Sequence, residues 1–192
     1  MVKIKVDLKE RGYEVMVGEN CLAEVGKYIK SNGWGEKVFI ITDPLVNDLY
    51  GDTLRKGLKG FEHYTLEVPR GEKNKTLTAA AKVYDALIKH AAHRDSIIIA
   101  LGGGVVGDLA GYVAATYMRG INCIQVPTTL LAQVDASIGG KTGVNHPKCK
   151  NMIGCFYQPK MVVCDVKTLT SLPARELRTG LAEVIKYGVI ED

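Results

Sequence analysis

Residues 96–115 read SIIIALGGGVVGDLAGYVAA, and this stretch gives the clearest indication of the fold in the sequence. It begins as a continuous apolar run, breaks on three consecutive glycines and resumes with helical spacing. A short apolar run bounded by glycine is typical of a strand that is buried on both faces. The glycines that follow serve either a tight turn or the close approach of the backbone to a ligand.

The rest of the chain repeats this alternation of strand and helix. Apolar runs predict strands at residues 37–42, 62–68, 96–101, 122–127 and 161–165. Helical spacing predicts helices at residues 44–58, 76–92, 105–118, 129–138 and 173–192. Strict alternation over residues 2–17 predicts an N-terminal β-hairpin with one face in water. We therefore predict an α/β fold, with a Rossmann-like, mostly parallel sheet and helices on both of its faces.

Composition excludes several classes of function. The chain has 192 residues, 46% of them hydrophobic, and a net charge of +4, which is ordinary for a globular domain. This charge gives no support to nucleic-acid binding, which usually shows a clustered basic stripe. The N-terminus, MVKIKVDLKE, is not a signal peptide, and no apolar run reaches the length of a membrane span. The five cysteines form no C-x-x-C pair, so we expect reduced thiols in a cytoplasmic protein.

The glycine turn matches a dinucleotide-binding pattern. Gly102, Gly104 and Gly107 satisfy G-x-G-x-x-G directly after a predicted strand and at the start of a helix. In this pattern glycines let the backbone reach a pyrophosphate at the helix N-terminus. The usual acid at the end of the next strand is missing, whereas Asp43 ends an earlier strand. The pattern alone leaves open a simple tight turn.

Residues 139–159, GGKTGVNHPKCKNMIGCFYQP, lack the apolar regularity of the other segments and predict a long ordered loop. No acidic residue occurs between Asp135 and Asp165, whereas four lysines do: Lys141, Lys148, Lys150 and Lys160. Such a segment beside glycines favours an electropositive hollow for a small anion. A solvated basic loop is the alternative reading.

The last predicted helix carries an acid and a base one turn apart. Its apolar residues predict a packed face made of Leu177, Leu181, Val184, Ile185 and Gly188. Glu183 and Lys186 lie on a neighbouring strip, where such a pair is usually a solvent-facing ion pair. A metal at Glu183 would need further ligands, typically histidines. The four histidines of the chain form no complete metal site in the sequence.

Four segments together resemble the 3-dehydroquinate synthase family of sugar phosphate cyclases. They are PRGEKNK (69–75), LGGGVVGDLAGYVAATYMRG (101–120), VPTTLLAQVDASIGGKTGVNHPKCKNMIGCFYQP (126–159) and LRTGLAEVIKYG (177–188). The resemblance implies a lyase that uses NAD and a divalent zinc or cobalt ion. Its expected reaction converts 3-deoxy-D-arabino-heptulosonate 7-phosphate to 3-dehydroquinate and phosphate in the shikimate pathway of aromatic amino acid biosynthesis. It also implies a homodimer.

The resemblance assigns roles to individual positions. For NAD it implies contacts from Asp43, Gly71, Glu72, Lys75, Gly103, Gly104, Val105, Gly107, Asp108, Thr128, Thr129, Lys141, Lys150, Thr168, Leu169, Thr170 and Ser171. For the substrate it implies contacts and catalysis from Asp135, Lys141, Asn151 and Lys186, with Arg119 binding phosphate across the dimer. Glu183 matches the metal-binding glutamate of the family.

The resemblance also divides the chain. Residues 1–172 are expected to form an NAD-binding α/β domain, and residues 173–192 the first helix of a helical domain for metal and substrate. The two histidine metal ligands of the family belong to that second domain, so we expect the 192-residue chain alone to be inactive. Three alternatives remain: another sugar phosphate cyclase, a metal-dependent polyol dehydrogenase of the glycerol dehydrogenase type, or a dinucleotide-binding module without chemistry.

Overall fold

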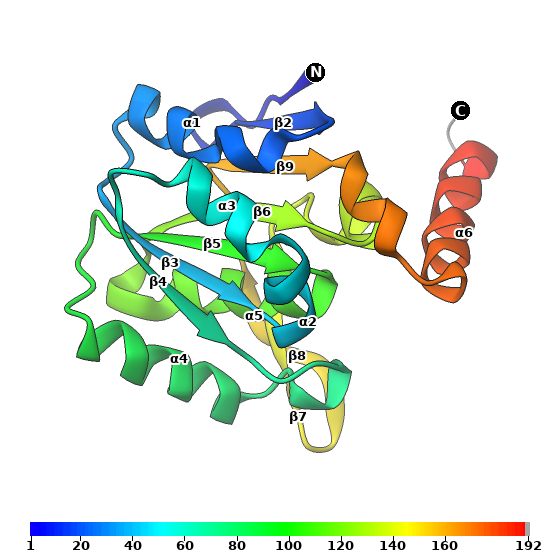
Figure 1. Ribbon diagram of the computed structural model, residues 1–192. Coiled ribbons are helices and arrows are strands. Elements are labelled where there is room, and N and C mark those ends of the chain that lie inside the picture. The colour runs from blue at the N-terminus through cyan, green and yellow to red at the C-terminus, as the bar shows by residue number, and fades with distance from the viewer. Residues whose placement is uncertain (191–192) are drawn as a thin grey trace.

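A seven-stranded sheet forms the centre of the computed structural model, which describes residues 1–190 (Figure 1). The strand order is β1-β2-β9-β6-β5-β3-β4. All neighbouring strands are parallel except β1, which pairs antiparallel with β2. The strands are β1 Val2–Val6, β2 Tyr13–Gly18, β3 Lys37–Thr42, β4 Glu62–Glu67, β5 Ile97–Gly102, β6 Asn122–Pro127 and β9 Met161–Asp165. The predicted Rossmann-like, mostly parallel α/β fold is confirmed.

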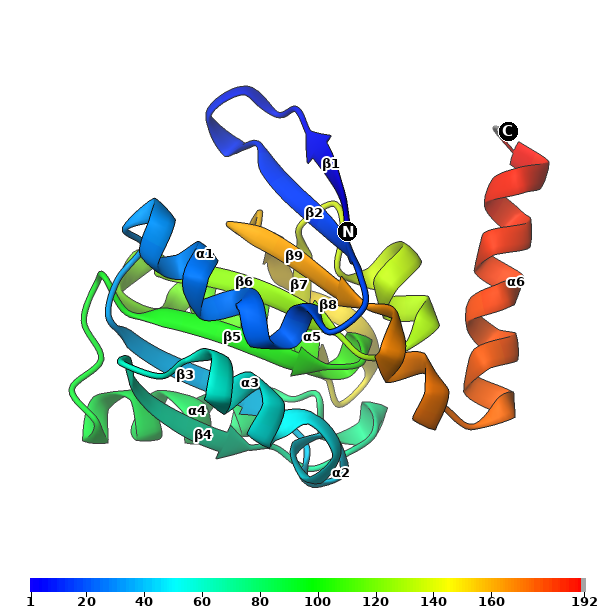
Figure 2. The same ribbon diagram turned by 45° about the horizontal axis from the view of Figure 1, so that its top comes forward.

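Helices cover both faces of the sheet (Figures 1 and 2). Alternate residues of β5 face two separate hydrophobic cores, as a strand period of two requires. On one face, Ile97, Ile99 and Leu101 pack with α1 (Val25–Asn32) and α3 (Asp52–Gly57). On the other face, Ile98 and Ala100 pack with α4 (Leu77–Lys89) and α5 (Gly104–Thr116). The continuous apolar run in the sequence therefore reflects a strand that is buried on both sides.

Local sequence signals set the ends of the helices. The carboxylate of Asp43 accepts hydrogen bonds from the backbone N–H groups of Leu45 and Val46 and begins α2 (Pro44–Val46). Thr76 caps α4 in the same way. Gly33 ends α1 at a φ of 61°, a left-handed conformation that glycine adopts without steric cost. These signals explain why the helix predicted from residue 44 begins there, and why the helix predicted from residue 76 begins one residue later, at Leu77.

The N-terminal hairpin forms as predicted, with β1 outside the main core. In β2, Tyr13 and Val15 are buried against Val162 and Cys164 of β9. In β1, Val2 and Ile4 remain exposed. Figure 2 shows the hairpin projecting from its edge of the sheet.

The prediction of a long loop over residues 139–159 is wrong. This segment forms a separate β-hairpin of β7 (Lys141–His146) and β8 (Cys149–Phe156). Val144 is fully buried in the core beside α5. The glycines of the hairpin permit close packing of its backbone. A Cβ atom on Gly154 would come within 2.1 Å of the Thr142 carbonyl oxygen. The glycine content that suggested a loop thus serves two closely packed strands.

The last helix, α6 (Ala174–Ile190), stands at the side of the sheet (Figures 1 and 2). Its predicted packed face is wrong, because Leu181 is 44% and Ile185 is 65% exposed. The helix instead contacts the body through Tyr187 and through Gly180, where an added Cβ atom would come within 2.6 Å of the Leu130 Cβ atom. Residues 191–192 of the predicted helix lie outside the described residues. Among residues 1–190, no helix is both long and apolar enough to cross a membrane.

The close contact between α1 and α3 gives a test of the core. An added Cβ atom at Gly26 would come within 2.0 Å of the Gly57 carbonyl oxygen. Gly26→Ala should therefore lower the free energy of unfolding by about 2 kcal/mol, although alanine has the higher helix propensity. Gly188→Ala in α6 is the matched control, since its Cβ atom would meet no atom of residues 1–190 within 4 Å. Urea denaturation followed by circular dichroism measures both variants, and an unchanged midpoint for Gly26→Ala would contradict the packing.

Candidate functional site

The predicted cofactor residues gather at one edge of the sheet. Parallel strands place their carboxyl ends together, and the loops that follow them form the usual ligand site of such sheets. Asp43 follows β3, residues 70–76 follow β4, Gly103 follows β5, and Thr128 follows β6. A 3₁₀ turn, Val166–Ser171, follows β9. Since β3 and β6 flank β5 on opposite sides, the glycine turn lies where the winding of the sheet reverses.

Gly103 and Gly104 of the glycine turn leave space that side chains would fill, and the turn does not require an unusual backbone conformation. Gly103 is extended, with φ −76° and ψ −174°, and precedes the first turn of α5. A Cβ atom added at Gly103 would lie 3.1 Å from the Thr129 Cγ2 atom. One added at Gly104 would lie 3.2 Å from the Ala136 Cβ atom. Within residues 1–190, no side chain caps this helix. The first N–H groups of α5, including that of Val105, thus form a narrow cradle suited to an anion.

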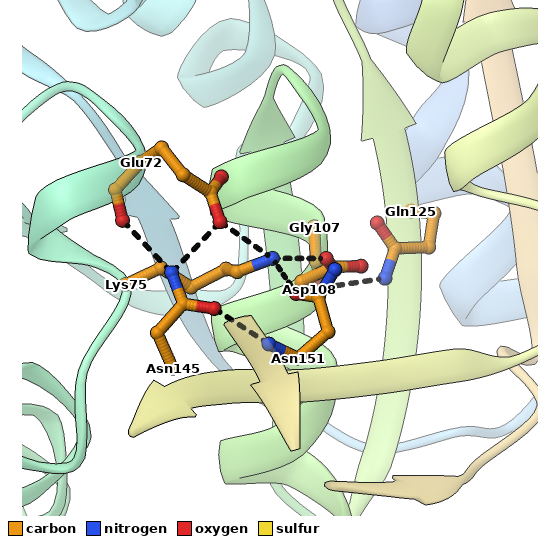
Figure 3. A network of polar contacts seen from close by, with 7 residues as sticks. All are labelled: Glu72, Lys75, Gly107, Asp108, Gln125, Asn145 and Asn151. Carbon is orange, nitrogen blue, oxygen red and sulfur yellow. Dashed lines mark hydrogen bonds and ion pairs between the residues drawn. The ribbon is translucent and has the colours of Figure 1, made fainter. Parts of the chain in front are cut away.

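Gly107 has a different role from the other glycines of the motif. Its carbonyl oxygen accepts a hydrogen bond of 3.1 Å from Nε2 of Gln125, a residue of β6. A Cβ atom at Gly107 would lie 2.8 Å from Oε1 of the same side chain. This glycine therefore lets α5 approach the sheet closely and faces the protein interior (Figure 3).

Lys75 joins the loop after β4 to α5 and to the β7–β8 hairpin (Figure 3). Its side chain is only 3% exposed. The Lys75 Nζ atom lies 2.8 Å from Oδ2 of Asp108, 2.6 Å from Oδ1 of Asn151 and 3.4 Å from Oε1 of Glu72. Burial raises the pKa of the Asp108 carboxyl, and the hydrogen bond from Lys75 opposes this shift. Three of the residues predicted to contact NAD and one predicted to contact substrate thus form a single network.

Asn145 also belongs to this network, although the sequence did not predict it. Its Nδ2 group donates to the backbone oxygen of Glu72 at 3.1 Å and to the Glu72 carboxylate at 2.8 Å. Its Oδ1 atom accepts from the backbone N–H of Asn151 at 2.8 Å. The partners are distant in sequence or lie across a hairpin that was not predicted, so no local pattern could reveal them.

Three of the five predicted substrate residues line one cleft of about 640 Å³ between α5, the β7–β8 hairpin and the π-helical turn Ala132–Ala136. Lys186 of α6 and Arg119 are not among the residues that line it. Asp135, Lys141 and Asn151 all face this cleft, and Asp108 joins them from α5. Lys150 is exposed on β8 next to Asn151. An ammonium group, an amide and two carboxylates around one cleft can bind a small molecule that carries both anionic groups and hydroxyls.

Helix α6 closes on this region through Tyr187. Its hydroxyl donates a 2.8 Å hydrogen bond to Oδ1 of Asp135, which raises the pKa of Tyr187 to about 12. Glu183 is 18% exposed and forms an ion pair with Lys186. The described residues, 1–190, contain no cluster of three or more His, Cys, Asp or Glu side chains. Glu183 therefore lacks the partners that a metal site requires within this part of the chain.

The remaining cofactor residues also hold local structure. The Asp43 carboxylate contacts Arg70, with its Oδ1 atom 3.4 Å from Nε, in addition to capping α2. Thr168 is buried and donates to the backbone oxygen of Asp165 at 2.7 Å, and its own backbone oxygen accepts from Tyr50. Leu169, Thr170 and Ser171 complete the same 3₁₀ turn.

Arg119 is the one predicted site residue at the opposite end of α5. It is exposed, has a φ of 67°, and follows the C-terminus of a 13-residue helix whose N-terminus is the glycine turn. A helix of this length extends for about 20 Å. Within one chain, Arg119 is therefore not brought together with the other site residues.

The fold and this site define a Rossmann-like α/β protein with an anion-receptive glycine turn beside a polar cleft. A family model described as 3-dehydroquinate synthase N-terminal matches residues 65–179. The chain belongs to the 3-dehydroquinate synthase family, as its sequence motifs predicted.

Known relatives support this assignment. The chain is 55% identical over 194 residues to the 3-dehydroquinate synthase of Desulforamulus reducens, covering 100% of this chain and 54% of that protein. The chain thus spans about half the length of the curated relatives it matches. A structure of 2-deoxy-scyllo-inosose synthase complexed with carbaglucose-6-phosphate, NAD+ and Co2+ matches with a TM-score of 0.90 and 31% identity, over 96% of this chain and 51% of that one. A 2-epi-5-epi-valiolone synthase from Streptomyces hygroscopicus, with NAD+ and Zn2+ bound, matches with a TM-score of 0.83 and 34% identity, over 94% and 50%.

The Lys75–Asp108 pair predicts a pH-dependent loss of stability. Lys75→Met removes the cation and raises the pKa of the partly buried Asp108 carboxyl further above its unfolded value of about 3.9. The ionised carboxylate is then destabilised in the folded state. The free energy of unfolding of Lys75→Met is therefore unaffected by this carboxyl below a pH of about 4, and it falls as the pH rises through the pKa of Asp108 in the folded state. The deficit relative to the unchanged chain should grow to about 2 kcal/mol at pH 7, measured by urea denaturation across this range.

The double variant Lys75→Met/Asp108→Asn is the control for this prediction. It removes the titrating carboxyl, so the growth of the deficit with pH should disappear. A deficit for Lys75→Met that stays constant between pH 4 and pH 7 would contradict the proposed electrostatic origin.

Proposed function

We propose that this chain forms the NAD-binding half of a 3-dehydroquinate synthase, which converts 3-deoxy-D-arabino-heptulosonate 7-phosphate to 3-dehydroquinate and phosphate. One observation carries the proposal: the glycine cradle and the cleft of Asp135, Lys141 and Asn151 meet at the same helix, α5. The family assignment and the identity of 55% to a 3-dehydroquinate synthase support it. The expected setting is the cytoplasmic shikimate pathway, in agreement with five unpaired cysteine thiols.

The residues fit a bound NAD along the carboxyl edge of the sheet. The open N–H groups of α5 would receive the pyrophosphate, and Asp43 and the loop of Gly71 and Glu72 would hold the nucleoside part. Thr128, Thr129, Lys141, Lys150 and the turn Thr168, Leu169, Thr170 and Ser171 would complete the site. NAD supplies a hydride acceptor that regains its starting state within the cycle, so the net reaction is a lyase reaction. Both sugar phosphate cyclase structures described above contain NAD+.

The cleft residues suit an anionic sugar phosphate. Lys141, together with Lys186 from α6, would neutralise carboxylate or phosphate, and Asn151 and Asp135 would orient hydroxyl groups. Arg119 would reach the phosphate from the second chain of a homodimer, since it lies far from its own site. The zinc or cobalt ion would bind Glu183 together with ligands outside this chain, in a helical domain that begins at residue 173. Residues 1–190 alone do not fit a metal site.

The alternatives differ in their products. Another sugar phosphate cyclase is favoured by the structural matches at 31% and 34% identity, but it would act on a different phosphorylated sugar. A polyol dehydrogenase would accumulate NADH and release no phosphate. A dinucleotide-binding module would bind NAD without turnover.

Titration calorimetry with NAD tests the cofactor site. The chain should bind one NAD, and Gly104→Val should weaken binding by at least tenfold, about 1.4 kcal/mol, because the added methyl groups fill the cradle. Gly188→Val is the matched control in an open position of α6 and should leave the affinity unchanged. Equal affinity in all three proteins would remove the glycine turn from the NAD site.

A second test separates cofactor binding from metal chemistry. The 192-residue chain should hold zinc weakly and release no phosphate from the heptulosonate phosphate, because one carboxylate is a poor zinc site. In a protein that also carries the second domain, Glu183→Ala should abolish phosphate release and spare NAD affinity. Zinc content by atomic absorption and a phosphate assay give the readouts. Stoichiometric zinc and phosphate release by the chain alone would contradict the proposed division of roles.

A further inference from the structure

Asn145 uses its backbone N–H and both polar groups of its side chain to join two parts of the site (Figure 3). Its backbone N–H donates to the backbone oxygen of Lys75 at 2.7 Å. Its side-chain Nδ2 donates twice to Glu72, once to the backbone oxygen and once to the carboxylate. Its Oδ1 accepts from the backbone N–H of Asn151. One residue of β7 therefore holds the loop after β4 on one side and strand β8 on the other.

The partners fix the orientation of both amides. A backbone N–H can only donate and a carboxylate can only accept, so Asn145 must turn Oδ1 toward Asn151 and Nδ2 toward Glu72. Lys75 can only donate, so Asn151 must turn its Oδ1 toward that ammonium group, at 2.6 Å. The Nδ2 group of Asn151 is then the donor left for a molecule in the cleft that this residue lines.

The backbone between these residues is irregular in a way that depends on Asn145. The register of β7 and β8 shifts between Val144 and His146, where Asn145 lies. Asn151 has a φ of 56°, a left-handed conformation that asparagine tolerates better than most residues. The hydrogen bond from its N–H to Oδ1 of Asn145 satisfies the backbone at this position. The placement of the Asn151 side chain therefore depends on Asn145.

We propose that Asn145 is a positioning residue that couples dinucleotide binding to the placement of Asn151 in the substrate cleft. The inference rests on the proposed function, in which Glu72 belongs to the NAD-binding loop. A nucleotide that orders Glu72 also orders the Nδ2 group of Asn145, and through Oδ1 the backbone of Asn151. Because coupling of binding free energies is reciprocal, a ligand held by Asn151 strengthens NAD binding by the same factor.

Two substitutions separate this coupling from a merely structural role. Asn145→Asp keeps an acceptor for the Asn151 N–H, but it loses both donors and sets a carboxylate against Glu72. Asn145→Ala removes both the Nδ2 donor to Glu72 and the Oδ1 acceptor for Asn151. Asn32→Ala is the control, since Asn32 is an exposed asparagine on α1 that bonds within its own helix. Thermal unfolding of each variant checks that the chain folds.

The readout is hydrogen exchange of the Asn151 amide, measured by NMR with and without saturating NAD. In the unchanged chain and in Asn32→Ala, NAD should slow this exchange by at least about fivefold. In Asn145→Ala the amide should exchange rapidly in both states. In Asn145→Asp the Asn151 amide should be protected without NAD and should gain no further protection when NAD binds. Calorimetry should show that this variant binds NAD more weakly than the unchanged chain.

The outcomes distinguish this inference from the proposed function. If the unchanged chain binds NAD while exchange at Asn151 does not change, the coupling is absent and the inference is wrong. If NAD slows exchange of the Asn151 amide in Asn145→Asp as much as in the unchanged chain, the inference is also wrong. The hydrogen bonds that Nδ2 of Asn145 donates to Glu72 would then not be needed for the coupling. If the unchanged chain binds no NAD, the proposed function fails, and the inference fails with it.

Discussion

The buried ammonium group of Lys75 is the interaction on which the site depends. A charge removed from water is tolerated only when polar partners surround it. Its partners, Glu72, Asp108 and Asn151, come from the loop after β4, from α5 and from β8. Satisfying one cation therefore requires three separate elements to meet at one point. Two of these partners, Asp108 and Asn151, also line the polar cleft, so the same contact holds the wall of that cleft against α5.

Glycines let these elements approach closely enough for that contact. Gly107 brings α5 against Gln125 of β6, and Gly111 meets Thr142 of β7, where an added Cβ atom would lie 2.5 Å from the threonine Cγ2 atom. At these two glycines no side chain of α5 separates its backbone from the sheet or from the β7–β8 hairpin, so the helix packs closely between them. Asp108 lies between these two glycines in sequence and points to Lys75. The glycine pattern that first suggested a ligand site therefore also builds the support on which that site rests.

The sequence predicts the central sheet well because burial on both faces affects every residue of a strand such as β5. Prediction from the sequence fails where an element makes few contacts with the body, or where the contacting residues are far apart in the sequence. Helix α6 contacts the body through Gly180 and Tyr187 rather than through its apolar residues, so the apolar pattern predicted the wrong face. The β7–β8 hairpin buries Val144 but few of its other side chains, which left a loop-like composition. Asn145 contacts Glu72 across 73 positions, beyond any local pattern. Asp135, Lys141 and Asn151 came from family resemblance, and the structure places them in one cleft.

The pairing of Lys75 with Asp108 also bears on the electrostatics of the cradle. A carboxylate near the N-terminus of a helix is attracted to the same partial positive charge that would bind a phosphate. Asp108 lies in the second turn of α5, close enough to weaken that field. The 2.8 Å contact with the ammonium group compensates its charge within the protein. The N–H groups of the first turn of α5 then keep their positive potential for an external anion. A buried lysine can in this way support a phosphate site without touching the phosphate.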